Sequence, residues 1–321
     1  MLPRTALRFS CLALPFLIAA GTSGAQNLPR GAATFLTSSR MVLVPVTVTD
    51  HDGRTMVGLQ AKDFSVFEGQ TPQTIVSFGT EDVPVSVGLV LDTSGSMQRT
   101  LGVVKEGAQA FVKTSNPDDE YLLMTVSTQP SAISEFTNDP EGMRQDIALT
   151  QPGGLTALID TVYMGLNQMR KARNPQRALV ILSDGMDNHS RYSKGELLRV
   201  ALEADVQIYT ILIDGAGGGS SGAGVLFRPS MIAKPGAQAA ERQGPSLLEE
   251  LAEKTGGLSF HARSEAQAQE AMLKASQALR NEYVIGYRPS DSGLTGTWRR
   301  IRVKSTVPKL NVHARSGYYA P

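Results

Sequence analysis

Apolar residues recur at every second position near both ends of the chain. The first such stretch is VLVPVTVT, which starts at Val42 and is followed by two shorter runs around a Gly/Pro turn. The last includes RRIRVKS, in which Ile301 and Val303 face one way and three basic residues face the other. Period-two alternation is typical of strands that bury one face. We therefore predict β segments over 41–83 and 281–321, and expect them to pack together as one small all-β domain.

Between these segments, strand-like runs alternate with helical ones. VSVGLVLD, YLLMTVST, RALVILSD and VQIYTILID have the apolar character and length of buried strands. Amphipathic stretches separate them, such as RTLGVVKEGAQAFVK, whose apolar residues share one helical face. This alternation favours a mostly parallel sheet with helices on both faces. Residues 84–280 are therefore expected to form an α/β domain.

Two kinds of local signal refine this domain. Three later helices are expected to start at capping boxes, where a hydroxyl and a Glu or Gln satisfy the first N–H groups. The three serines concerned are Ser193, Ser246 and Ser264. Residues 215–245 are rich in Gly, Ala, Ser and Pro and lack apolar spacing, so they are expected to form a flexible surface loop.

The first residues predict export. Arg4 and Arg8 precede a short apolar run and a small-residue end, which is typical of a secretory signal peptide. The run is shorter than the ~20 residues of a membrane span. We expect residues 1–25 to be removed, 26–40 to be disordered, and the mature protein to be periplasmic or extracellular. Cys11 is the only cysteine, so the mature chain would have no disulfide or thiolate metal site.

Charge and composition exclude two classes of partner. Lys and Arg number 31 against 30 Asp and Glu. Outside the leader there is neither a basic block nor an apolar run long enough to span a bilayer. The sequence therefore predicts neither nucleic-acid binding nor membrane insertion.

Oxygen-bearing side chains gather where predicted strands end. The run VSVGLVLD ends at Asp92, just before a turn with two serines, and RALVILSD ends at Asp184. A Gly-Gly loop leads to Thr156 between them. Because ligands of open α/β sheets bind beyond the carboxyl ends of the strands, we expect one site there. Its predicted residues are Asp92, Ser94, Ser96, Thr156 and Asp184.

This set of side chains suits a hard divalent cation. All its donors are oxygen atoms, which favours Mg²⁺ first, with Mn²⁺ or Ca²⁺ also possible, over zinc or copper. Two carboxylates balance the charge of the ion and the other donors are neutral, so the ion could accept another anionic oxygen. A partner's Asp or Glu carboxylate is the natural occupant of that position.

The spacing of these residues resembles a known site. DTSGSM, GGLTALID and LSDGMDN, in this order, are similar to the metal-ion-dependent adhesion site of von Willebrand factor type A domains. The resemblance implies a Rossmann-like domain, direct or water-mediated metal contacts from Asp92, Ser94, Ser96 and Thr156, and a water-mediated contact from Asp184. The flanking β segments resemble a bacterial family of exported proteins related to this domain, abundant in acidobacteria.

The same residues also have simpler interpretations. Asp92 and the serines could satisfy a turn, and Thr156 could also cap a helix. We expect Asp187, Asn188 and His189 to lie in a solvated loop. We expect a module that binds a protein or glycan ligand through the ion. The alternatives are a structural protein in which the metal only stabilises the fold and a metal-dependent phosphatase. A phosphatase is disfavoured because Ser94 stands where haloacid-dehalogenase-type enzymes carry a second aspartate, so we expect no catalysis.

Overall fold

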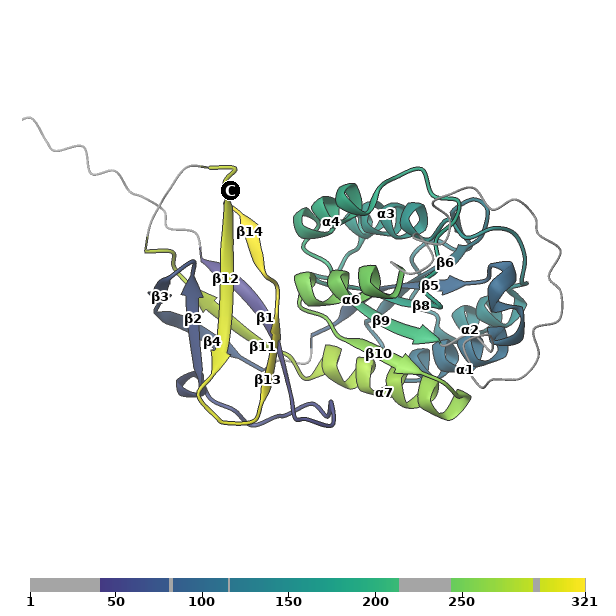
Figure 1. Ribbon diagram of the computed structural model, residues 1–321. Coiled ribbons are helices and arrows are strands. Elements are labelled where there is room, and N and C mark those ends of the chain that lie inside the picture. Colours follow the sequence, from purple (N-terminus) through teal and green to yellow (C-terminus); the bar gives the residue numbers. More distant parts are fainter. Residues whose placement is uncertain (1–40, 81–82, 115, 214–243, 291–294, 321) are drawn as a thin grey trace, which may run out of the picture. The chain divides into compact units, whose positions relative to one another are not determined.

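The structure is a computed structural model, and it describes most of the chain downstream of residue 40 (Figure 1). The described ranges are 41–80, 83–114, 116–213, 244–290 and 295–320. The predicted signal peptide, the predicted disordered segment and nearly all of the predicted Gly-rich loop lie outside them. In the described part no helix is both long and apolar enough to cross a membrane.

A mostly parallel sheet forms the centre of the α/β domain. Its strands, in spatial order, are β10 (Ser259–Ala262), β9 (Gln207–Ile213), β8 (Gln176–Ser183), β5 (Val85–Asp92), β6 (Glu120–Val126) and β7 (Ser131–Ala132). Only the short β7 pairs antiparallel in this sheet. Every residue of β5, β6 and β9 is buried, as expected for strands covered on both faces.

Helices cover both faces of this sheet, and each face has its own apolar core. One group is α1 (Leu101–Val112), α2 (Pro140–Leu149) and α7 (Glu265–Arg280). The other is α3 (Leu158–Gln168), α4 (Lys194–Glu203) and α6 (Gly244–Thr255). Short 3-10 segments are η1 (Ala61–Asp63), η2 (Gly95–Arg99) and η3 (Met169–Lys171). The predicted α/β fold is confirmed.

Strands from both ends of the chain form two further sheets. One has the order β13 (Asn311–Ala314), β1 (Val42–Thr49), β11 (Tyr283–Tyr287), β4 (Ile75–Gly79). The other has the order β14 (Gly317–Tyr319), β12 (Trp298–Ser305), β2 (Phe64–Glu68), β3 (Thr71–Gln73). Val44, Val66, Ile285 and Ile301 belong to a single core that both sheets share. The N-terminal and C-terminal β segments therefore pack together, as the alternation predicted.

The helix starts agree only partly with the sequence. Ser193 forms the full capping box with Glu196, and the Ser264 side chain accepts the N–H of Gln267. The prediction at Ser246 is wrong, because α6 already begins at Gly244, inside the segment assigned to the loop. Helix α2 was not predicted: it buries only Met143 and Ile147, which is too narrow an apolar stripe to stand out in the sequence.

Candidate metal centre

The site lies beyond the carboxyl ends of β5 and β8, where the order of the strands in the sheet switches direction. Strand β5 is followed along the chain by β6 on one side, and β8 by β9 on the other, so β5 and β8 flank a switch in strand order. Such a switch leaves a crevice beyond the carboxyl ends of the two strands. Their pairing aligns Leu91 with Leu182, which puts Asp92 beside Ser183 and Asp184 just beyond.

Asp92 forms the floor of the site. Its side chain is fully buried, its Oδ2 accepts a hydrogen bond of 2.5 Å from Ser183 Oγ, and its Oδ1 accepts one of 3.0 Å from the N–H of Ser94. Burial raises the pKa of the Asp92 carboxyl to about 6. The hydrogen bonds from Ser183 and Ser94 oppose this rise, whereas the charge of Asp184 adds to it. The two acids are therefore close enough to interact electrostatically.

The two serines reach from this floor to the surface. Ser94 is buried and Ser96 is exposed, and their Oγ atoms lie 3.1 Å apart. Gly95 between them donates its N–H to the carbonyl of Gly154 at 3.1 Å, and a side chain on Gly95 would contact that carbonyl at 3.4 Å. That distance is an ordinary van der Waals contact. The position that requires glycine is Gly154, whose φ is 82° and whose Cβ would lie 2.6 Å from Thr128 Oγ1.

Backbone hydrogen bonds position the loop that carries Thr156. Gly153 donates to the carbonyl of Thr93 at 2.7 Å, so the loop is tied to the turn after β5. On its other side, the Thr156 carbonyl accepts the N–H groups of Asn188 and His189 at 3.0 Å each. The structure therefore brings the segments of all five predicted residues to one edge of the sheet, with Thr156 buried and Asp184 partly exposed.

The interpretation of Thr156 as the cap of helix α3 is wrong. Thr156 is not its cap; Ala157 occupies that position without a side-chain hydrogen bond. Instead, Asp187 Oδ1 accepts the N–H of Leu158 at 2.9 Å, and Ser190 Oγ accepts that of Asp160 at 3.1 Å. The solvated-loop interpretation of Asp187 is thus wrong, because this carboxylate caps a helix from the loop after β8.

Sequence reasoning also missed two anchors around the site. Ser183 is not among the predicted residues, although a hydroxyl at the end of a strand paired with β5 is a usable signal. Asn188, which was grouped with the solvated residues, accepts the N–H of Thr156 through its Oδ1 at 3.0 Å. Ser183 thus positions Asp92, and Asn188 positions Thr156, both of which are predicted metal ligands. The site therefore depends on contacts between distant segments.

Asp160 fixes the outer part of the same loop. It is 4% exposed, and its carboxylate accepts the N–H groups of Arg191 at 2.9 Å and Tyr192 at 3.0 Å and pairs with the Arg191 guanidinium. We expect Asp160→Ala to lower the free energy of unfolding by about 2 kcal/mol, because two backbone N–H groups and a guanidinium lose a buried, charged acceptor. Urea unfolding measures this, with Asp118→Ala, at an exposed acid, as control; equal stability of the two variants would contradict the assignment.

The residues present fit a divalent cation. Asp92 is fully buried close to Asp184, and the hydroxyl groups of Ser183 and Ser94 lie within hydrogen-bonding distance of its carboxylate. Among the described residues, no Lys, Arg or His forms an ion pair with Asp92 or Asp184. A buried acid without a counter-charge is costly. A hard cation with oxygen ligands would supply that charge.

A second group of possible ligands has another explanation. Asp50, His51 and Asp52 offer ligand atoms within 4.8 Å of one another. However, Asp50 Oδ1 accepts the N–H groups of Asp52 and Arg54, and the Arg54 guanidinium pairs with both acids. These acids therefore already have hydrogen-bond and ion-pair partners within four residues, as is typical of an exposed turn.

Part of the chain matches the sequence model of a known domain family. Residues 87–186 match the family model of the von Willebrand factor type A domain. An uncharacterised protein of Borreliella burgdorferi is 26% identical over 199 residues, which are 59% of this chain and 57% of that protein. The match thus spans little more than half of the relative's length.

Two solved structures are similar at low sequence identity. The von Willebrand factor type A protein from Catenulispora acidiphila is 11% identical, with a TM-score of 0.49 over 89% of this chain and 75% of that one. The vWF domain of the type V pili tip protein Mfa5 from Porphyromonas gingivalis is 15% identical, with a TM-score of 0.47 over 63% and 96% of the two chains.

Proposed function

Because residues 87–186 form a von Willebrand factor type A domain, we propose that the chain is an exported module that binds a protein or glycan ligand through a divalent cation. One observation carries the proposal: the buried Asp92 and its neighbour Asp184 form an acidic pair that no described basic side chain compensates. A module with this role needs no catalytic step, and we propose none.

The ion would be held by the five predicted side chains. Asp92, Ser94, Ser96 and Thr156 would contact it directly or through water, and Asp184 through a water molecule. Mg²⁺ is the proposed ion, with Mn²⁺ or Ca²⁺ as alternatives. When bound, the ion supplies a positive charge that attracts an acidic oxygen of the ligand. Ser96 and Asp184 reach the surface, so the edge that they form is open to such a ligand.

The surface beside the site favours a protein ligand. A hollow of about 490 Å³ borders Thr93 and Gly153 and is also lined by Ile133 and Leu149, which are 47% and 73% exposed. Leu155, next to Thr156, is 49% exposed. Exposed apolar side chains gathered around a charged site are typical of protein-binding surfaces. A structural role, in which the ion only stabilises the sheet edge, gives no reason for this exposure.

Capture of partners from envelope and culture fractions of the organism that produces the protein tests the proposal. The bait is the mature chain, offered with Mg²⁺ or with EDTA, and captured proteins and glycans are identified by mass spectrometry. We expect a specific partner that is lost in EDTA and with Asp92→Ala, but retained by Asp118→Ala. A partner that stays bound in EDTA, or metal-dependent folding without any metal-dependent partner, would contradict the binding role.

A further inference from the structure

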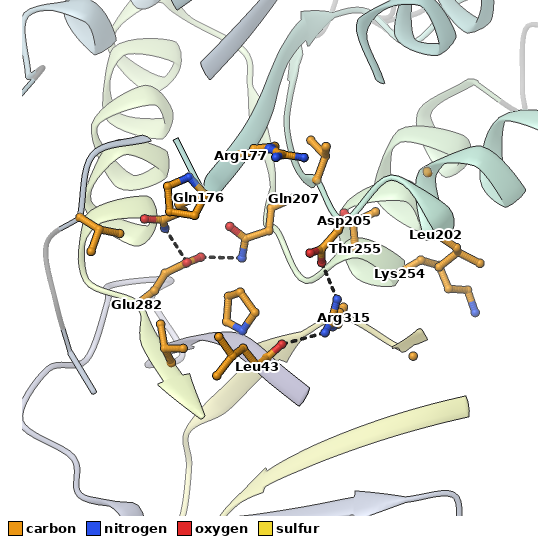
Figure 2. A pocket seen from close by; sticks show the side chains of 17 residues that line it. Leu43, Gln176, Arg177, Leu202, Asp205, Gln207, Lys254, Thr255, Glu282 and Arg315 are labelled. Atoms are coloured by element: carbon orange, nitrogen blue, oxygen red, sulfur yellow. Dashed lines mark hydrogen bonds and ion pairs between the residues drawn. The ribbon is translucent and has the colours of Figure 1, made fainter. Parts of the chain in front are cut away.

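A cavity lies at the opposite end of the central sheet from the metal site. It has a volume of about 380 Å³, within the usual range for small-molecule sites. Its walls come from the amino ends of β8 and β9, the end of α4, and the β1 and β11 strands (Figure 2). It is separate from the proposed function, because none of the five predicted metal ligands lines it.

Most of the cavity wall is apolar. Strand β1 contributes Leu43 and Pro45, helix α4 contributes Ala201, and strand β11 contributes Val284. Aliphatic side chains and proline rings offer no hydrogen bonds, so water in this space is poorly held. A ligand with a hydrocarbon body would displace it favourably.

The two acids that line the cavity are already satisfied. Glu282 accepts hydrogen bonds from Gln176 Nε2 at 2.6 Å and Gln207 Nε2 at 2.5 Å. Asp205 pairs with the Arg315 guanidinium, which also donates to the Leu43 carbonyl at 2.7 Å. Figure 2 shows both groups joined by dashed lines on the wall. Neither acid therefore needs a cationic ligand.

More basic than acidic side chains line the cavity among the described residues. Arg177, Lys254 and Arg315 line the cavity, and only Arg315 is paired with a lining acid. Among the described residues, the Arg177 side chain makes one hydrogen bond, a long one of 3.4 Å from Nε to the Asn174 carbonyl, and no ion pair. In Figure 2 it is joined to no other residue drawn. A partly buried guanidinium without a carboxylate beside an apolar space is suited to an anionic head group.

We propose that this cavity binds a small amphiphile with a hydrocarbon body and a single carboxylate, whose head group contacts Arg177. The apolar walls select the body of the ligand and the guanidinium selects its charge. The occupant is therefore a medium-chain fatty acid or a molecule of the same chemistry. Its binding is independent of the divalent cation.

Titration of the mature chain with octanoate and with 1-octanol tests this directly, by calorimetry and ligand-observed NMR. We expect octanoate to bind about tenfold more tightly than octanol, because only its head group can form charge-assisted hydrogen bonds. Arg177→Gln should remove this preference, whereas Arg300→Gln, on an exposed strand position, should keep it. Val284→Trp, which fills the cavity, should abolish binding of both probes.

Two results would overturn the proposal. One is equal affinity of the wild-type chain for octanoate and octanol, or no binding of either. The other is octanoate binding that Val284→Trp leaves unchanged, since the probe would then occupy another place. Melting curves of each variant verify folding, and repeating the titration in EDTA, where octanoate binding should persist, separates this site from the metal centre.

Discussion

Mg²⁺ is expected to raise the melting temperature of the wild-type chain and to leave that of Asp92→Asn unchanged. Burial raises the pKa of Asp92 from 3.8 to about 6. A raised pKa means that this acid favours folding fully below pH 3.8 and that the contribution is lost as the pH rises through about 6. Above that pH the metal-free site holds two uncompensated carboxylates, and an ion that binds only the folded chain relieves them.

The size of this effect follows from mass action. At an ion concentration of a hundred times Kd, binding adds roughly 2.7 kcal/mol to the free energy of unfolding. Asp92→Asn removes the charge with little change in shape, so without metal it should be at least as stable as the wild type. Asp118→Asn is the control and should respond to Mg²⁺ as the wild type does. Equal Mg²⁺ responses of wild type and Asp92→Asn would place the ion elsewhere.

Because of Glu282, the free energy of unfolding is expected to fall as the pH rises toward 7. Glu282 is buried directly before β11, where the side chains of Thr47, Gln176, Gln207 and Tyr209 donate to it. Burial raises its pKa from 4.5 to about 7, although these hydrogen bonds lower it. The folded chain thus keeps a proton that the unfolded chain has lost between those two values.

The sign of the pH effect is therefore fixed. The contribution of Glu282 is fully present below pH 4.5 and is lost as the pH rises through about 7. Across this pH range, titration of Glu282 should lower the free energy of unfolding by roughly 3 kcal/mol. Glu282→Gln should flatten this part of the stability curve, measured by urea unfolding across that range. Glu253→Gln, at an exposed acid, should leave the curve as in the wild type.

A curve for Glu282→Gln that falls as steeply as that of the wild type would contradict this account. Titration of Asp92 contributes to both curves and cancels in their difference. The Gln207 side chain can adapt to the variant, because its Oε1 has no hydrogen-bond partner among the described residues. An amide flip would turn this oxygen toward the N–H group that the substitution introduces.

Local pattern was sufficient for the main elements of the fold. The alternation around Val44 and Ile301 predicted the paired β segments, and the apolar run that ends at Asp92 predicted a buried central strand. The donor set was also visible, because DTSGSM, the Gly-Gly loop and LSDGMDN each stand at the end of an element in a fixed order. Within each of these motifs the signal spans only a few residues, where sequence reasoning is strongest.

The features that sequence reasoning missed depend on long-range contacts. Asp187 caps a helix that starts 29 residues earlier, and Ser183 bonds Asp92 91 residues away. Glu282 differs from an exposed glutamate only through packing of the two β segments against the α/β domain. Helix α2 begins at Pro140 and is capped by Asp139, which together are a typical helix start. Its apolar stripe is too narrow for the helix to be recognised from the sequence.

Anomalous scattering from crystals grown with Mn²⁺ tests whether the site at Asp92 binds a divalent cation. Manganese is a hard cation with the same preference for oxygen ligands and can be located by its own signal. We expect one strong peak beyond the carboxyl ends of β5 and β8, within ligand distance of Asp92, Ser94 or Ser96. No peak there, or a peak only at the exposed Asp50–Asp52 turn, would contradict it.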